Sequence, residues 1–235
     1  MLDWIEQHQA ALSIFISLGT LLVWLVYAQL LFFSFRRQRS PRIIINRGKR
    51  KNMDALCIIS NMSKEAVYVE YIMAILHTSK GTITMDVTDF EQSYKEGTES
   101  DDKAQYYSIG SIQDNTRQGP LGSEDFMHIG RFSDIVKRLA HYQGIPMRGC
   151  VPDADIDFEC LTIQVIALYG PDYRPISAKR SFTLNNDKNT GDLMPASLGT
   201  QQGSSFLHRR RLCKMVNAMN ESNFSASSTI PRDNQ

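Results

Sequence analysis

The longest uninterrupted apolar stretch of the chain lies near its N-terminus, where residues 10–35 contain no charged side chain. A helix needs about 20 apolar residues to cross the roughly 30 Å of a bilayer's hydrocarbon core, and this stretch exceeds that length. Its few hydroxyl side chains are compatible with lipid because they can bond back to the helix backbone. The pattern predicts a transmembrane helix over residues 10–35 and a short extracytoplasmic N-terminus over residues 1–9.

A cleavable signal peptide and a buried soluble helix are the alternatives for this stretch. A signal peptide has a basic start, a short apolar core and small residues at its cleavage site. Here the start carries Asp3 and Glu6 and no Lys or Arg, and bulky residues occupy 31–33, where small ones are needed. A buried soluble helix is rarely apolar on all faces for so long. Both alternatives are therefore disfavoured.

Basic residues gather directly after the apolar stretch, and none precedes it. The positive-inside rule therefore predicts a single-pass protein of the plasma (inner) membrane, with its N-terminus outside and the rest of the chain in the cytoplasm. The same side chains can contact anionic lipid headgroups, although setting the topology explains them equally well. This basic juxtamembrane segment covers residues 36–52, and its predicted membrane-surface residues are Arg36, Arg37, Arg39, Arg42, Arg47, Lys49, Arg50 and Lys51.

Beyond the apolar stretch, residues 42–184 contain short apolar runs separated by turn-forming residues, a pattern that predicts β-strands. The predicted strands cover 42–46, 55–60, 66–78, 82–87, 106–112, 158–169 and 176–184. In two of them the odd positions are apolar and should share one face, namely Val67, Val69, Tyr71, Met73 and Ile75, and Leu161, Ile163, Val165, Ala167 and Tyr169. One helix is expected between Ser133, as its N-cap, and Gly144, because apolar residues recur there at helical spacing.

Six to eight short strands with one connecting helix predict a mainly β fold. We expect an N-terminal single transmembrane helix followed by an antiparallel β-sandwich, the cytoplasmic domain, with one packed helix; an immunoglobulin-like arrangement is one option. The Cys-Trp-Cys pattern of a true immunoglobulin domain is missing, because Trp4 and Trp24 both precede this region. A doubly wound parallel fold is disfavoured because strands and helices do not alternate.

Residues 185–235 are rich in Asn, Ser, Gln and Gly, which predicts a C-terminal flexible segment. Within it we expect a linker over 185–203 and a loose tail over 221–235. Between these, residues 204–220 predict a short basic amphipathic helix. This helix either packs on the β domain, which its short apolar face favours, or lies on a membrane surface or docks on a partner.

Composition changes this picture little. The 235 residues are 42% hydrophobic and 22% charged, and the formal net charge of +1 gives no general attraction to nucleic acid. The cysteines, at positions 57, 150, 160 and 213, show no paired spacing. They are expected to be reduced thiols, as is usual in the cytoplasm.

Sequence patterns for catalysis and metal binding are weak. Residues 153–159 resemble the start of a calcium loop, but Phe158 stands where the loop needs Gly and Gln164 where it needs Glu. The five histidines have no metal-ligand spacing, and neither a nucleophile elbow nor a phosphate-binding glycine loop occurs. The sequence therefore predicts no enzyme, no cofactor and no metal site. Glycosylation sequons at Asn61, Asn220 and Asn223 are expected to stay unmodified in the cytoplasm.

These features favour a membrane-anchored protein that presents a cytoplasmic β-sandwich as an interaction or scaffolding domain, without catalysis. Its expected partners are the lipid bilayer, through the N-terminal helix, and a protein whose identity the sequence does not give; nucleic acid and small-molecule substrates are not expected. One alternative is an accessory subunit of a larger membrane complex, such as a channel or transporter, with small residues near Gly19 as the helix contact. Another is a hydrolase whose triad comes from separate loops.

Overall fold

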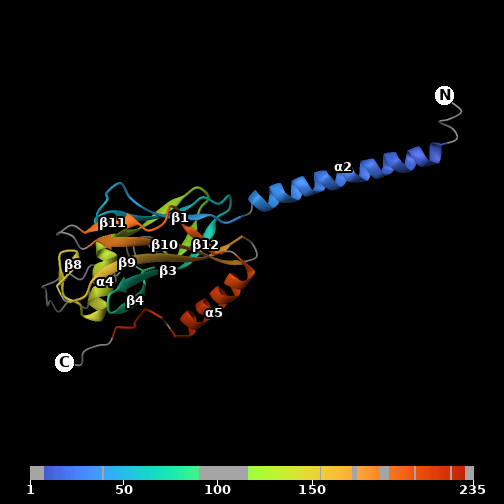
Figure 1. Cartoon of the computed structure of the whole chain (residues 1–235). Helices are drawn as coiled ribbons and strands as arrows, with labels where there is room; N and C mark the ends of the chain where they lie inside the picture. The colour runs from blue at the N-terminus through green and yellow to red at the C-terminus, as the bar shows by residue number, and fades with distance from the viewer. Residues whose placement is uncertain are drawn as a thin grey trace. The chain divides into compact units, whose positions relative to one another are not determined.

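The computed structural model describes residues 8–38, 40–89, 116–153, 155–170, 174–185, 191–203, 205–222 and 224–230. The chain divides into two compact units, Met1–Ser40 and Pro41–Gln235. The first contains one long helix, and the second is the β domain (Figure 1). The strand predicted over 106–112 lies outside the described residues.

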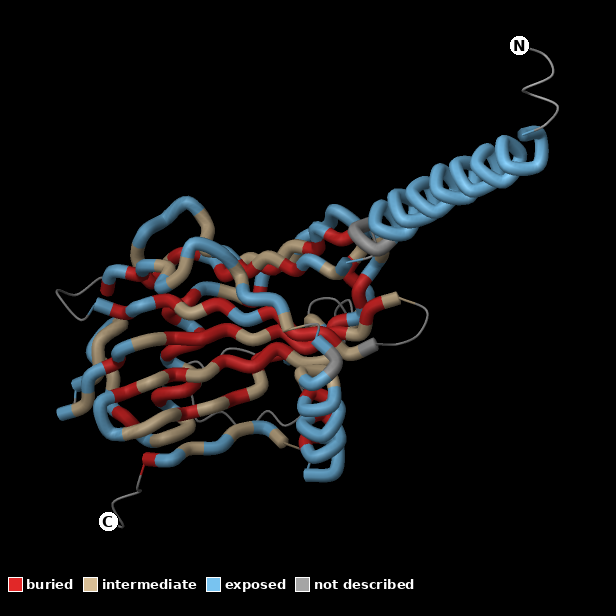
Figure 2. Tube along the Cα trace, turned by 45° about the vertical axis from the view of Figure 1, so that its right-hand side comes forward, coloured by how far each residue is buried: buried red, intermediate tan, exposed pale blue. Residues whose placement is uncertain are grey.

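Helix α2 runs from Gln9 to Gln38 and is long and apolar enough, over Gln9–Phe35, to cross a membrane. Its side chains are exposed from Gln9 to Phe35 (Figure 2). Ser13 Oγ donates a hydrogen bond to the carbonyl of Ala10 at 2.9 Å, and Thr20 Oγ1 donates to that of Ile16 at 2.8 Å. These hydroxyls are therefore satisfied within the helix, as the sequence predicts, and place no unpaired donor in an apolar medium.

Two antiparallel sheets form the β domain. The small sheet has the order β1-β2-β6, and its strands are β1 (Ile43–Arg47), β2 (Leu56–Asn61) and β6 (Phe126–Arg131). The large sheet follows the path β11-β10-β9-β3-β4-β13, with strands β11 (Asp192–Pro195), β10 (Arg174–Asn185), β9 (Phe158–Tyr169), β3 (Val67–Thr78), β4 (Gly81–Asp86) and β13 (Ala226–Ser228). Off this path, β12 (Gln201–Gly203) pairs with β10 and β5 (Gly119–Leu121) with β3, while β7 (Met147–Arg148) and β8 (Val151–Pro152) form a separate ribbon.

The mainly β, antiparallel prediction is confirmed by this topology. The strand order differs from the four-plus-three order of an immunoglobulin domain, because the large sheet runs through six strands. One hydrophobic core lies between the small sheet, α4 (Phe132–Gln143) and the inner face of the large sheet.

Helix α4 forms where its apolar spacing predicts, and its residues Ile135, Val136 and Leu139 are buried in the core. Gly144 ends it in the left-handed conformation, with φ at 75°. Ser133 is not the N-cap, and this prediction is wrong. The backbone N–H groups of Phe132 and Ser133 instead donate to the carbonyls of Ala55 and Met53, so the β1–β2 loop caps the helix.

A β-bulge in β3 changes which side chains face the core. Val67 and Val69 are buried in the core, and the register with β9 then shifts between Val69 and Tyr71. Beyond the shift, Ile72 and the alternate residues after it face the core, while Met73 lies on the opposite face. The simple alternation predicted for 66–78 is therefore correct only before the bulge, because one extra residue reverses the parity of a strand.

Helix α5 (Phe206–Ser222) packs on the outer face of the large sheet. Its buried residues Leu212, Val216 and Met219 contact Met73 and Ile166, so the expectation of a packed terminal helix is confirmed. The apolar face is used inside the domain, and the exposed basic side chains remain on the opposite side.

The prediction of a flexible segment over 185–235 is wrong for most of its described residues. Strand β11 and strand β12 both pair with β10, and β13 pairs with β4. Leu193 is fully buried, which anchors β11 to the core. These strands are short and lie at sheet edges with one face in solvent, so their polar composition resembles that of a linker.

The aromatic pair in the core should contribute strongly to the stability of the β domain. The rings of Phe132 and Phe182 meet edge to face with centroids 4.7 Å apart. We expect Phe182→Ala to lower the free energy of unfolding by about 3–5 kcal/mol, because it removes buried area and leaves a cavity. Urea denaturation of the detergent-solubilised chain, followed by circular dichroism, measures this change. Leu198→Ala is the control, because Leu198 is fully exposed and its loss should matter little.

Candidate functional site

Strand β1 separates two ends of the β domain. The residues at these ends are close in sequence, but the strand holds them apart. At one end, here called the tether end, Arg42 precedes β1 and its carbonyl accepts from the N–H of Met62. At the other, the distal end, the N–H of Gly48 donates to the carbonyl of Leu56. Five residues of strand lie between them, which corresponds to about 17 Å.

The predicted basic set is divided between these ends. Arg36 and Arg37 lie in the last turns of α2, and Arg39 is outside the described residues. Arg42 is exposed at the tether end, whereas Lys49, Arg50 and Lys51 are exposed at the distal end. Arg47 is half-buried, and its Nη1 donates to the carbonyl of Leu193 at 2.8 Å, which ties it to β11. The set therefore does not form one surface on the β domain, although it still satisfies the sequence-based rule for topology.

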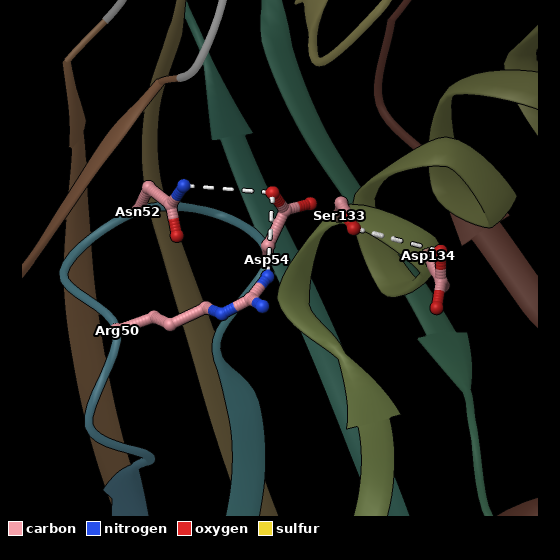
Figure 3. A network of polar contacts seen from close by, with 5 residues as sticks. All are labelled: Arg50, Asn52, Asp54, Ser133 and Asp134. Atoms are coloured by element: carbon pink, nitrogen blue, oxygen red, sulfur yellow. Dashed lines mark hydrogen bonds and ion pairs between the residues drawn. The ribbon is translucent and has the colours of Figure 1, made fainter.

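A cavity of about 260 Å³ lies at the distal end. Its lining consists of Gly48, Lys49, Arg50, Asp54, Ala55, Leu56 and Arg131. Arg50 Nη1 lies 4.0 Å from Asp54 Oδ2, and Asn52 Nδ2 lies 3.5 Å from the same oxygen (Figure 3). Three cationic side chains against one carboxylate give this distal pocket a positive character, which suits a carboxylate or another anionic group.

The pocket's positive charge comes from side chains rather than from the N-terminus of α4. The first amides of that helix are already bonded to Met53 and Ala55, and Ser133 Oγ lies 3.5 Å from Asp134 Oδ1 (Figure 3). Leu56 adds an apolar wall, since it is 42% exposed at the start of β2. Charge and apolar area together are typical of a surface that binds an acidic protein segment.

A buried arginine joins the two sheets. Arg180 on β10 donates from Nη1 to the carbonyl of Ile45 at 2.7 Å and to Asn46 Oδ1 at 3.2 Å. Its Nη2 donates to the carbonyls of Ser197 and Leu198 at 3.3 and 3.4 Å. Burial lowers the pKa of this guanidinium, and the nearby charge of Arg47 lowers it further. No signal in the sequence marks Arg180 as buried, because an arginine within a strand usually faces solvent.

Side chains also close the free edge of β1. Gln202 accepts from the N–H of Ile43 through Oε1 and donates to the carbonyl of the same residue through Nε2. Thr200 Oγ1 accepts from the N–H of Ile45 at 2.9 Å. These residues do for β1 what a neighbouring strand would do, so its position relative to the large sheet is fixed.

A serine–histidine pair bears on the hydrolase alternative. Ser177 Oγ and His208 Nε2 are 2.7 Å apart, where α5 crosses β10. Ser177 is only 4% exposed, and no carboxylate among the described residues bonds to either side chain. The pair joins α5 to the large sheet, and its hydroxyl is covered from solvent.

The calcium-like segment and the sequon at Asn61 are the remaining candidates from the sequence. Asp153 forms an exposed ion pair with Arg148 at 3.3 Å, and Ala154 of the calcium-like segment is outside the described residues. Across the described ranges, no group of three His, Cys, Asp or Glu side chains is close enough to hold a metal. Asn61 is fully buried, and its Nδ2 contacts the carbonyls of Glu65, Leu121 and Gly122. The sequon at Asn61 is therefore inaccessible in the folded domain.

The buried guanidinium should be more important for stability than a surface one. We expect Arg180→Met to lower the free energy of unfolding by about 2–4 kcal/mol, because carbonyls that it satisfies lose their donor. Arg148→Met is the matched control, since its exposed ion pair should contribute under about 1 kcal/mol. Urea denaturation of both variants in detergent compares them, and equal midpoints would contradict the role given to Arg180.

No family model matches the chain, and neither a curated protein nor a solved structure matches it.

Proposed function

We propose that this chain is a single-pass membrane protein that presents its β domain in the cytoplasm as a non-catalytic interaction or scaffolding module. The observation that carries the proposal is helix α2, which is apolar on every face and exposed over Gln9–Phe35. Such a helix needs an apolar solvent. An N-terminal apolar helix followed by a β domain fits a single-pass membrane protein, although a signal sequence would satisfy the same length and apolarity.

Two observations support a cytoplasmic β domain. Basic residues follow α2 and none precedes it, which favours retention of the following segment on the cytoplasmic side. The four cysteines are free thiols, which suits a reducing compartment. Burial raises the pKa of the Cys57 thiol, so this residue is unreactive whichever side it occupies.

The distal pocket is the proposed contact for a protein partner. Lys49 and Arg131 provide cationic groups around Leu56, and Arg50 is partly engaged by Asp54. An acidic segment with one apolar side chain would match this arrangement. The pocket is separated from the start of β1 by the length of that strand.

Thiol labelling in intact cells tests the orientation. Cys213 is exposed on α5, so a membrane-impermeant maleimide should label it only after the cells are made permeable. In the Cys213→Ser variant, the remaining maleimide label measures the reaction of the half-buried cysteines. Cys57 is buried and should react only after unfolding. A reporter fused after Gln235 gives an independent readout. Labelling of Cys213 in sealed cells, together with an external reporter signal, would overturn the proposed orientation.

Purification at native expression level tests the interaction role. In mild detergent we expect a species larger than the chain alone, which the double variant Lys49→Glu/Arg131→Glu should reduce at least tenfold. The matched control is Arg148→Glu, an exposed charge outside the pocket lining. Circular dichroism confirms that each variant is folded. Recovery of the chain alone, from wild type and variants equally, would contradict the interaction role.

The same purification separates the alternatives. An accessory subunit would contact its complex through α2, and a Cβ at Gly19 meets nothing within 4 Å, so Gly19→Leu leaves the chain's own fold intact. Loss of the larger species in this variant, with the pocket variants unaffected, would favour the accessory subunit. The Ser177–His208 pair is the observation behind the hydrolase alternative. Labelling of Ser177 by a fluorophosphonate would favour that alternative.

A further inference from the structure

The tether end exposes two large apolar side chains on neighbouring turns. Met62 follows β2 directly and is 55% exposed, and Phe126 begins β6 and is 67% exposed. They are close in the fold because Phe126 pairs with Ser60 across the sheet. Exposed side chains of this size, presented together, mark a surface that meets another apolar phase.

A buried asparagine orders the backbone that carries them. Asn61 contacts three carbonyls through Nδ2, and its Oδ1 accepts from the N–H of Ser63 at 2.9 Å. Ser63 Oγ in turn accepts from the N–H of Arg42, and its carbonyl accepts from Ser123 Oγ. The turns around Met62 and Phe126 are thereby tied to each other and to the start of β1.

Two cationic side chains are exposed at the same end. Arg42 accepts from the N–H of Met62 through its carbonyl, and Lys64 follows Met62 by two residues. Helix α5 starts nearby, because Gln202, in the strand before it, bonds to Ile43 at the start of β1 (Figure 1).

Two features limit the charge and add apolar area. Glu124 and Asp125 are exposed beside Phe126 and offset part of the positive charge. Leu207, at the start of α5, is 70% exposed and adds to the apolar side chains at this end. Apolar and cationic groups therefore both contribute to the surface, which is the combination that binds a bilayer interface.

We infer that the tether end docks on the anionic lipid surface next to which α2 ends. Met62 and Phe126 enter the interfacial layer, and Arg42 and Lys64 meet lipid phosphates. The connection from Gln38 to Ile43 reaches about 17 Å at most when fully extended, which keeps any docking search short. This inference rests on the proposed membrane anchor and goes beyond it, because it assigns a lipid-binding face to the β domain.

Lipid quenching of site-specific probes tests the docking in the full chain. The chain is reconstituted into phosphatidylcholine vesicles with and without phosphatidylserine, each containing nitroxide-labelled lipid. A bimane probe is attached at Met62→Cys or Phe126→Cys in a background whose other accessible cysteines are serine. Leu56→Cys is the matched control, because Leu56 is a half-exposed apolar residue at the opposite end of β2.

We expect both tether-end probes to be quenched in the anionic vesicles and the Leu56→Cys probe to be quenched far less. High salt should reduce the effect, because it screens exposed charges. Arg42→Glu and Lys64→Glu should each weaken docking roughly fivefold, while Arg148→Glu should leave it unchanged.

Three results would overturn the inference. The first is equal quenching at all three probe positions. The second is quenching that depends neither on phosphatidylserine nor on the charge reversals. The third is absence of lipid quenching with probe self-quenching that rises with protein density, which would assign the surface to a second copy of the chain. Extraction of the chain by alkaline carbonate would instead contradict the anchor itself, so failure of the proposed function is distinguishable.

Discussion

The β domain depends on how the open edge of β1 is closed. On one side β1 bonds to β2 through the backbone, and on the other it meets Gln202, Thr200 and the guanidinium of Arg180. A strand edge left open would be a template for pairing with other chains, and its amides would lack partners. These contacts also attach the small sheet to the large one, so the tether end and the distal pocket keep a constant separation.

The predictable parts of the fold are those in which local pattern and tertiary burial agree. β9 follows simple alternation, and its odd residues from Leu161 to Tyr169 all lie in the core. β3 departs from this alternation because of its bulge. The bulge arises where β3 pairs with β9, and the composition of the strand does not indicate it. β11, β12 and β13 were missed because an edge strand needs few apolar residues; a single one, Leu193, holds β11. The cap of α4 was missed because its partners come from a loop about 80 residues earlier in the chain.

The candidate site could be predicted only in part, because long-range contacts bring its residues together. The sequence shows that five of the residues from 42 to 51 are basic. It cannot show that a five-residue strand places Arg42 and Lys49 at opposite ends of a sheet. Arg131 joins Lys49 at the pocket only through the pairing of β2 with β6, which is a long-range contact. Met62 and Phe126 share this origin, since neither stands out until the turns bring them together. What the sequence did identify, the apolar helix and its one-sided basic flank, depends on local composition alone.

Strand β1 is also the first part of the β domain to take up any force applied from the N-terminal side. A pull on Arg42 along the strand axis stretches the bonds to β2 and the side-chain bonds to Gln202 and Thr200 at the same time, because these bonds run across the strand. A pull directed across the sheet would open them one after another. The domain should therefore withstand far more tension along β1 than across it, so the direction of loading governs how firmly it is held.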